Sequence, residues 1–199
     1  MAEYGFPGAT ALALIYKDGV ILAADRRASY GTFVLSKNAR KVFKITETIG
    51  LVSAGFISDM QTLVREARFS ANMFRLQNNR EMNSRALAKL MSNALFSSRM
   101  APLMTQTIVG GFDKGEKSVI VLDALGSLIE DQYAAVGSGS EVALGVLEAD
   151  YKKDMTYEEA KDLVARTVNA ALARDSASGN GTDLLVITKD KTWEEFIAP

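Results

Sequence analysis

The chain of 199 residues contains no cysteine and no histidine. Their absence excludes a Ser-His-Asp triad, a thiol nucleophile and a zinc site of cysteines and histidines. Any catalysis must therefore use hydroxyl groups, carboxylates, lysine, arginine or the α-amine of the chain itself. We expect no metal and no organic cofactor. Without cysteine there is also no disulfide framework, which fits a reducing compartment, so we expect a cytoplasmic protein.

Long apolar runs and an excess of basic charge are missing as well. No apolar run reaches 18 residues, and residues 1–8 lack the basic start and apolar core of a signal peptide. The net charge is −1, and the isoelectric point of about 5.6 gives no sign of a basic patch. We therefore expect no membrane partner and no nucleic-acid partner. A hydrophobic content of 48% and this length fit a single globular domain.

Short apolar runs predict strands in the first quarter of the chain. Residues 10–16 and 19–24 flank a Lys-Asp-Gly turn, which is a strong hairpin signal. The second run, GVILAA, does not alternate, so both of its faces should be buried. Residues 41–45 and Ile49–Gly55 follow as a second strand pair.

Apolar residues at helical spacing then predict two pairs of helices. The pattern of Ser58 with Gln61 predicts a capping box at the start of the first helix, and Thr156 with Glu159 predicts one for the last. The other predicted segments are a helix over 83–98, strands over 105–112, 117–124 and 127–137, a helix from residue 140, and strands over 183–190 and 193–198. Strand pairs that alternate with helix pairs disfavour a parallel doubly wound sheet. We expect an α+β fold in which two antiparallel sheets stack between two helix layers, a four-layer αββα sandwich.

Three polar segments could carry chemistry. Asp25 ends the apolar run VILAAD, and Lys41 begins the next strand as a candidate partner for a buried carboxylate. Spacing alone favours the simpler interpretation that Asp25 lies at an exposed strand end. The segment 174–183 is typical of a polar turn, and residues 137–140, GSGS, are typical of a helix-capping turn. No Lys-Ser or Lys-Thr follows GSGS, so a phosphate loop is not indicated.

Taken in order, six motifs resemble the β-type subunits of archaeal 20S proteasomes. The resemblance covers Gly8 to Asp190, and six motifs in register make it specific. An α-type subunit is a poorer match, because residues 1–8 leave no room for the N-terminal helix of those subunits. The motifs are KDGVILAADRRAS, SKNARKVFKI, SAG (53–55), VGG (109–111), LIEDQYAAVGSGS and RDSASGNG.

This resemblance implies an N-terminal nucleophile hydrolase fold and a place in a threonine endopeptidase complex. Its partners would be α-type subunits and other β subunits in stacked seven-membered rings. Its substrates would be unfolded polypeptides delivered by an ATPase regulator. In such enzymes removal of a propeptide frees an N-terminal threonine, whose α-amine serves as the base for its hydroxyl.

The resemblance also implies roles for individual residues. Asp25 and Lys41 would form an ion pair beside the nucleophile, and the N–H of Gly55 would face the oxyanion. A network around the α-amine would consist of Ser138, Asp175 and Ser178. The substrate pocket, which suggests a preference for apolar side chains, would be shaped by Ala28, Ala39, Phe43, Ser53 and Ile57.

The chain departs from the family at the nucleophile. Counted back from the Lys-Asp-Gly turn, that position falls on Ala9, directly after Gly8. Alanine has no hydroxyl, so it can neither release a propeptide nor form an acyl intermediate. We expect residues 1–9 to be a leader, residues 10–199 to be one proteasome β-type domain, and the chain to be unprocessed. A naturally silent subunit and a precursor form with threonine replaced by alanine both fit.

Two alternatives remain open. Thr10 could act as the nucleophile after cleavage behind Ala9. That change moves the reactive group by about 3.3 Å along the strand and to the opposite face, which a bulge could absorb. Residues 12–15, however, match the family with Ala9 as the first position. The other alternative is a stand-alone binding domain that forms no ring.

Overall fold

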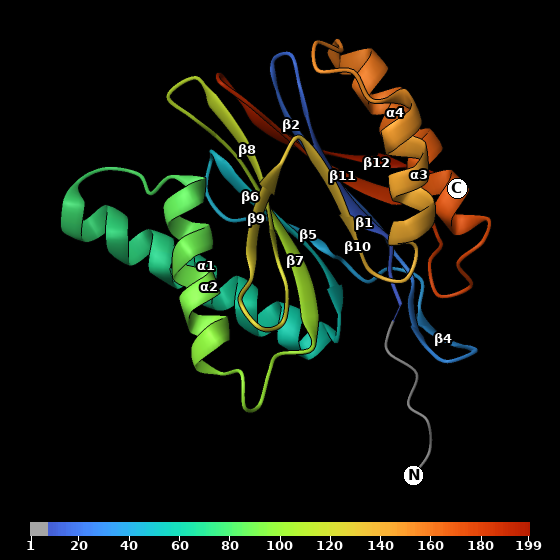
Figure 1. The fold of residues 1–199 in the computed structure, drawn as a ribbon, viewed down its shortest axis with the longest axis horizontal. Coiled ribbons are helices and arrows are strands. Elements are labelled where there is room, and N and C mark those ends of the chain that lie inside the picture. Colours follow the sequence, from blue (N-terminus) through green and yellow to red (C-terminus); the bar gives the residue numbers. More distant parts are fainter. Residues whose placement is uncertain (1–7) are drawn as a thin grey trace.

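The computed structural model describes residues 8–199. Of the expected leader, residues 1–9, only Gly8 and Ala9 lie within the described residues. Two five-stranded antiparallel sheets lie face to face, and a pair of helices covers the outer face of each (Figure 1). The predicted αββα sandwich is confirmed. In residues 8–199 no helix is both long enough and apolar enough to cross a lipid bilayer.

The first sheet has the order β10-β1-β2-β11-β12 and is covered by α3 and α4. The hairpin of β1 and β2 pairs Tyr16 with Gly19, which confirms the predicted turn. The elements of this half are β1 (Ala11–Tyr16), β2 (Gly19–Asp25), β10 (Tyr133–Val136), β11 (Thr182–Thr188), β12 (Thr192–Ile197), α3 (Ser140–Asp150) and α4 (Tyr157–Leu172).

The second sheet has the order β5-β6-β7-β8-β9 and is covered by α1 and α2. A separate two-stranded hairpin, which the sequence analysis did not predict, joins the two sheets. The elements are β5 (Val42–Lys44), β6 (Ile49–Gly55), β7 (Thr105–Asp113), β8 (Glu116–Leu122), β9 (Leu128–Asp131), α1 (Ile57–Asn78), α2 (Ser84–Ser97), and the hairpin strands β3 (Ala28–Tyr30) and β4 (Phe33–Ser36).

Strand β1 places alternate side chains in two different cores, as the twofold period of a strand requires. Ala9, Ala11 and Ala13 belong to the core between the two sheets. Leu12 and Leu14 belong to the core beneath α3 and α4. The alternation predicts that the side chain of residue 10 is on the helix side of the sheet and that of residue 9 is on the inter-sheet side.

Two local predictions were wrong. Residues 127–137 do not form one strand, because the chain passes at Gln132 from β9 in the second sheet to β10 in the first. Ser58 does not cap α1, which begins at Ile57 with Phe56 as its N-cap, and the Ser58 hydroxyl instead donates to Asp59 at 3.1 Å. The capping box of Thr156 and Glu159 is confirmed.

Candidate active site

The expected site residues come from both sheets and meet at one end of the sandwich. Ala9 and Thr10 precede β1, Asp25 ends β2, and Lys41 directly precedes β5. Gly55 ends β6, and Ser138 lies in the loop before α3. Asp175 and Ser178 lie in the loop before β11. The topology therefore brings together segments that are up to 168 positions apart in the chain.

Asp25 is completely buried, and four donors satisfy its carboxylate. Oδ1 accepts hydrogen bonds from Nζ of Lys41 at 2.6 Å and from the N–H of Thr10 at 3.0 Å. Oδ2 accepts from the N–H groups of Arg27 and Gly179, both at 2.9 Å. The interpretation of Asp25 as an exposed strand end is therefore wrong. A buried carboxylate needs such partners because burial removes its hydration.

Lys41 is 2% exposed and donates to the carbonyl oxygen of Arg27 at 2.5 Å as well as to Asp25. Desolvation by burial lowers the pKa of Lys41, and the attraction of the Asp25 carboxylate opposes this shift. A buried ammonium with a lowered pKa can give up or share a proton more readily than a surface lysine can.

A second polar cluster is centred on Asp175. Its Oδ2 accepts from the hydroxyls of Ser138 and Ser178, each at 2.6 Å. Because both hydroxyl protons point to the carboxylate, Oγ of Ser138 accepts from the N–H of Ala9 at 3.1 Å. For the same reason the Thr10 hydroxyl donates to Oγ of Ser178 at 2.8 Å. One carboxylate thus orients the hydrogen bonds of both residues at the start of β1.

Ala9 and Thr10 face opposite sides of the first sheet. The methyl group of Ala9 lies in the inter-sheet core with Ala54, and Ala9 is 1% exposed. Thr10 is fully buried on the other side, where a Cβ added at Gly139 would lie 2.0 Å from its hydroxyl oxygen. Glycine at position 139 therefore leaves the space that this hydroxyl needs.

Gly55 marks the end of β6 and has a φ of +134°, a conformation that L side chains rarely adopt. A Cβ at this position would also lie 2.2 Å from the carbonyl oxygen of Met104. Gly55 and Gly8 line two separate cavities, one on the side of Lys41 and one on the side of Ser138.

Two of the five expected pocket residues line the cavity on the Lys41 side, namely Ala28 and Ile57. Ser53 is buried, and its hydroxyl is hydrogen-bonded to that of Thr107 at 2.8 Å. Phe43 packs against the core beneath α1 and α2. The half-buried Ala39 donates its N–H to the carbonyl oxygen of Arg26 at 2.8 Å. A shared pocket for all five residues stays a prediction.

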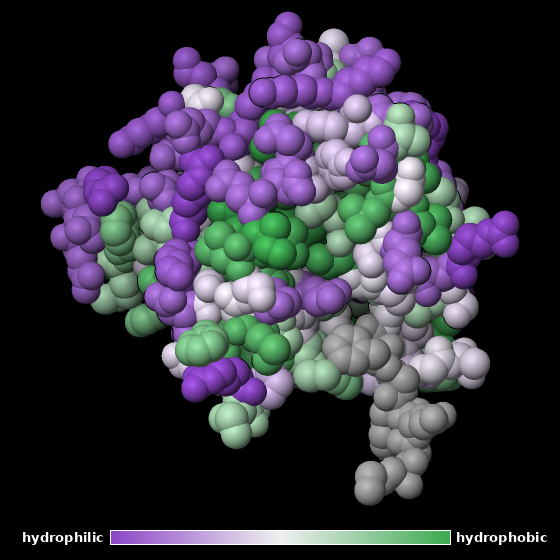
Figure 2. Space-filling view, in the orientation of Figure 1, coloured by the Kyte–Doolittle hydropathy of each residue, from purple (hydrophilic) through white to green (hydrophobic). Residues whose placement is uncertain are grey.

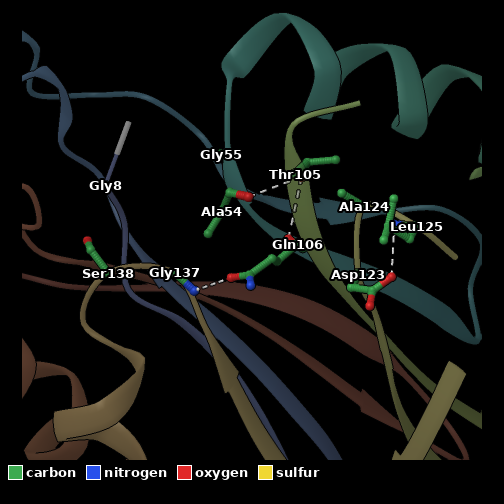
Figure 3. A pocket seen from close by; sticks show the side chains of 10 residues that line it. All are labelled: Gly8, Ala54, Gly55, Thr105, Gln106, Asp123, Ala124, Leu125, Gly137 and Ser138. Carbon is green, nitrogen blue, oxygen red and sulfur yellow. Dashed lines mark hydrogen bonds between the residues drawn. The ribbon is translucent and has the colours of Figure 1, made fainter. Parts of the chain in front are cut away.

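The cavity on the Ser138 side has a volume of about 370 Å³ (Figure 3). Gly55 and Ser138 line it as expected site residues, whereas the sequence analysis did not identify Gln106, Asp123 and Leu125. Asp123 directly follows the apolar strand β8, and a carboxylate at a strand end is the same signal that drew attention to Asp25. Within residues 8–199, no group of three or more acidic side chains has the arrangement of a metal site.

Comparison with known proteins identifies the family of the chain. The proteasome subunit family matches residues 6–187. Proteasome subunit beta 1 of Ignicoccus hospitalis is 46% identical over 181 residues, which cover 91% of each chain. Proteasome subunit beta 1 of Nitrosopumilus maritimus is 47% identical over 191 residues, 96% of this chain and 95% of the relative. Proteasome subunit beta 2 of Pyrobaculum calidifontis is 44% identical over 197 residues, 99% of this chain and 97% of the relative. The chain therefore belongs to the proteasome subunit family, among its β subunits.

Proposed function

We propose that this chain is a β subunit of the 20S proteasome core particle that keeps the surroundings of the active site but hydrolyses nothing itself. In this proposal Ala9 occupies the position of the nucleophilic threonine. The supporting observation is that the N–H of Ala9 is bound to Ser138 and thereby to Asp175, while its methyl group lies on the inter-sheet side.

The surrounding groups are suited to acyl transfer by a hydroxyl at position 9. A free amine at that position would take up the hydroxyl proton, with Ser138 and Asp175 holding the amine in place. Lys41 and Thr10 share Oδ1 of Asp25, so the ammonium lies beside the Ala9–Thr10 peptide, where it would favour the deprotonated amine. The N–H of Gly55 would stabilise the oxyanion. Without a hydroxyl, no acyl intermediate can form.

The contacts of Thr10 favour Ala9 as the nucleophile position. The Thr10 hydroxyl is bound to Ser178 and lies against Gly139, on the opposite side of the sheet from the methyl group of Ala9. Its N–H is held by Asp25. For Thr10 to act as the nucleophile, β1 would have to shift by one residue, and the pairing of Ala11 with Ala24 and Val136 would be lost.

The proposal includes a place in stacked seven-membered rings with α-type and other β subunits. Unfolded polypeptides delivered by an ATPase regulator would be the substrates of the particle. All four residues of the edge strand β9 are exposed, Ile129 to 59%. Figure 2 shows apolar surface at the centre of the face turned to the viewer, in the region where Figure 1 shows β9. Such a strand favours contact with another subunit. The expected leader and the cytoplasmic location remain parts of this proposal.

Introduction of a hydroxyl group at position 9 tests the proposal. We expect Ala9→Thr, in the assembled particle, to release residues 1–8 and to cleave peptides with apolar side chains. Ala9→Val is the matched control, because valine has the shape of threonine without its hydroxyl, and it should do neither. Intact mass and release of a fluorogenic group measure the two results. An Ala9→Thr chain that assembles but keeps its leader would contradict the assignment.

A further inference from the structure

The cavity on the Ser138 side is lined by Gly55 and Ser138 of the proposed site, but also by Gln106, Asp123 and Leu125, which have no role in the proposed chemistry. It lies across Gly55 from the cavity that contains Lys41. Its volume of about 370 Å³ is within the range of small-ligand sites. Figure 3 shows that its walls come from the ends of β6 and β7, the loop after β8 and the loop before α3. A ligand there would touch the same glycine that borders the expected oxyanion position.

The cavity combines apolar walls with a single charge. Ala54, Ala124 and Leu125 supply apolar surface, and Asp123 supplies a carboxylate. A hydrogen bond from the side chain of Ser127 is the main cause of the lowered pKa of Asp123, so this carboxylate is ionised at neutral pH. None of the described residues that line the cavity is basic. The cavity therefore presents a negative charge without a lysine or arginine of its own to neutralise it.

Gln106 adds an oriented amide group from the start of β7, the strand paired with the one that Asp123 follows, and its side chain extends toward Gly137 (Figure 3). Its side-chain oxygen accepts the N–H of Gly137 at 3.0 Å, which leaves the amide NH₂ group as the donor. A ligand that complements the cavity should thus carry a cation for Asp123, an apolar stem for the alanine and leucine walls, and a carbonyl oxygen for Gln106.

We propose that this cavity binds a lysine or arginine side chain of a polypeptide that lies across the site, with the cation at Asp123 and a neighbouring peptide carbonyl at Gln106. The choice of a polypeptide as the ligand rests on the proposed function. In a chain that cannot cleave, such a site holds a basic segment without consuming it.

Binding of labelled peptides to the purified full-length chain tests this proposal. Four capped hexapeptides differ at one central position, which is lysine, arginine, norleucine or glutamate. Fluorescence anisotropy at low salt should show that the lysine and arginine peptides bind about tenfold more tightly than the norleucine peptide. The glutamate peptide should bind most weakly. The advantage of lysine should shrink as salt is raised, because salt screens the charge of Asp123.

The variant Asp123→Asn removes the charge and keeps the loop. Oδ1 of Asp123 accepts from the N–H groups of Leu125 and Ser127, both at 2.9 Å, and an asparagine oxygen can accept both. We expect this variant to bind the lysine and norleucine peptides equally. The matched control, Asp131→Asn, changes an exposed carboxylate on β9 outside the cavity and should keep the preference for lysine.

Three results would overturn the proposal: no binding of any peptide, equal binding of lysine and norleucine by the unchanged chain, or a preference that survives in Asp123→Asn. Each of these leaves the proposed function intact, since that function stands or falls with the processing of Ala9→Thr. Conversely, an unprocessed Ala9→Thr chain would contradict the silent-subunit assignment whatever the peptides do.

Discussion

At the scale of single residues, the two carboxylates of the site are satisfied by different donors. Asp25 is neutralised by the ammonium of Lys41 and receives three backbone N–H groups. Asp175 has two serine hydroxyls and the N–H of Ala177. The buried charge of Asp25 thus depends on its ion pair with Lys41, whereas Asp175 orients neutral hydroxyl and N–H groups.

Removal of Lys41 should expose the cost of leaving Asp25 unpaired. We expect Lys41→Ala to lower the free energy of unfolding by about 3–5 kcal/mol, because a buried charge loses its partner. The control Lys44→Ala breaks an ion pair with Glu47, whose side chain is 80% exposed, and should cost less than about 1 kcal/mol. Denaturant unfolding measures both. Equal losses would mean that the Lys41 pair is no more important to stability than a surface contact.

Thr10 and Thr167 are both fully buried, but within residues 8–199 their side-chain hydroxyls differ in hydrogen bonding. The Thr10 hydroxyl is bound to Ser178, whereas Oγ1 of Thr167 has no hydrogen-bond partner among the described residues. Thr10→Val should cost about 1–3 kcal/mol, since Ser178 loses its donor in a buried position. Thr167→Val should be neutral or stabilising. Thermal unfolding compares them, and the opposite order would refute the hydroxyl chain from Thr10 to Asp175.

At the scale of elements, the edge strand β12 is attached to α4 by a polar cluster around Glu195. This carboxylate accepts hydrogen bonds from Tyr157 and Lys161 of α4, and from the Trp193 indole at 2.7 Å. Burial acts to raise the pKa of Glu195, but these donors outweigh it and lower the pKa to about 2. The cluster thus holds the negative form of Glu195 between a helix and the last strand of the sheet.

The lowered pKa of Glu195 makes the stability of this attachment depend on pH. A carboxyl with a lower pKa in the folded state contributes stability above its unfolded pKa of about 4.3, and this is lost as the pH falls toward 2. We expect the unchanged protein to lose about 1–2 kcal/mol more than Glu195→Gln between pH 5 and pH 2, allowing for solvent screening.

Denaturant unfolding at several pH values checks this prediction. Glu194→Gln is the control, since its partner Arg40 lies at the surface, and it should follow the unchanged protein. A Glu195→Gln variant with the same pH profile as the unchanged protein would contradict the account of the cluster.

The elements also show which features could be predicted from the sequence. The capping box of Thr156 and Glu159 was found because both partners lie within one turn. The start of α1 was missed because it follows the positive φ of Gly55, a tertiary feature of the turn out of β6. The break at Gln132 was missed because the pairing of β9 with β8 and of β10 with β1 fixes it, and no glycine or proline marks it.

The site was predicted more from resemblance than from pattern. Spacing suggested a partner for Asp25 in Lys41 but favoured an exposed carboxylate, and only the fold shows that it is buried. The cluster of Ser138, Asp175 and Ser178 could not be found by local patterns, because Ser138 lies 37 positions from Asp175 and meets it only after α3 and α4 pack. Asp123 could have been found in the same way as Asp25, as a carboxylate at the end of an apolar run.

At the scale of the whole molecule, the start of β1 decides which side chain could act as the nucleophile. The hairpin of β1 and β2 fixes the register in which Ala9 faces the inter-sheet core and Thr10 faces the helices. A particle assembled with an α-type partner would retain this register, whereas a stand-alone binding domain would form no such particle. Removal of the leader inside the particle therefore shows directly which residue can act as the nucleophile.

The most direct measurement is the N-terminal residue of the unchanged chain, determined by sequencing and intact mass on the assembled particle. We predict that Ala9 is still preceded by Gly8, with a mass near the 21.5 kDa of the full chain. A chain that begins at Thr10 would contradict it, because Thr10 would then have released the leader and would itself be the nucleophile.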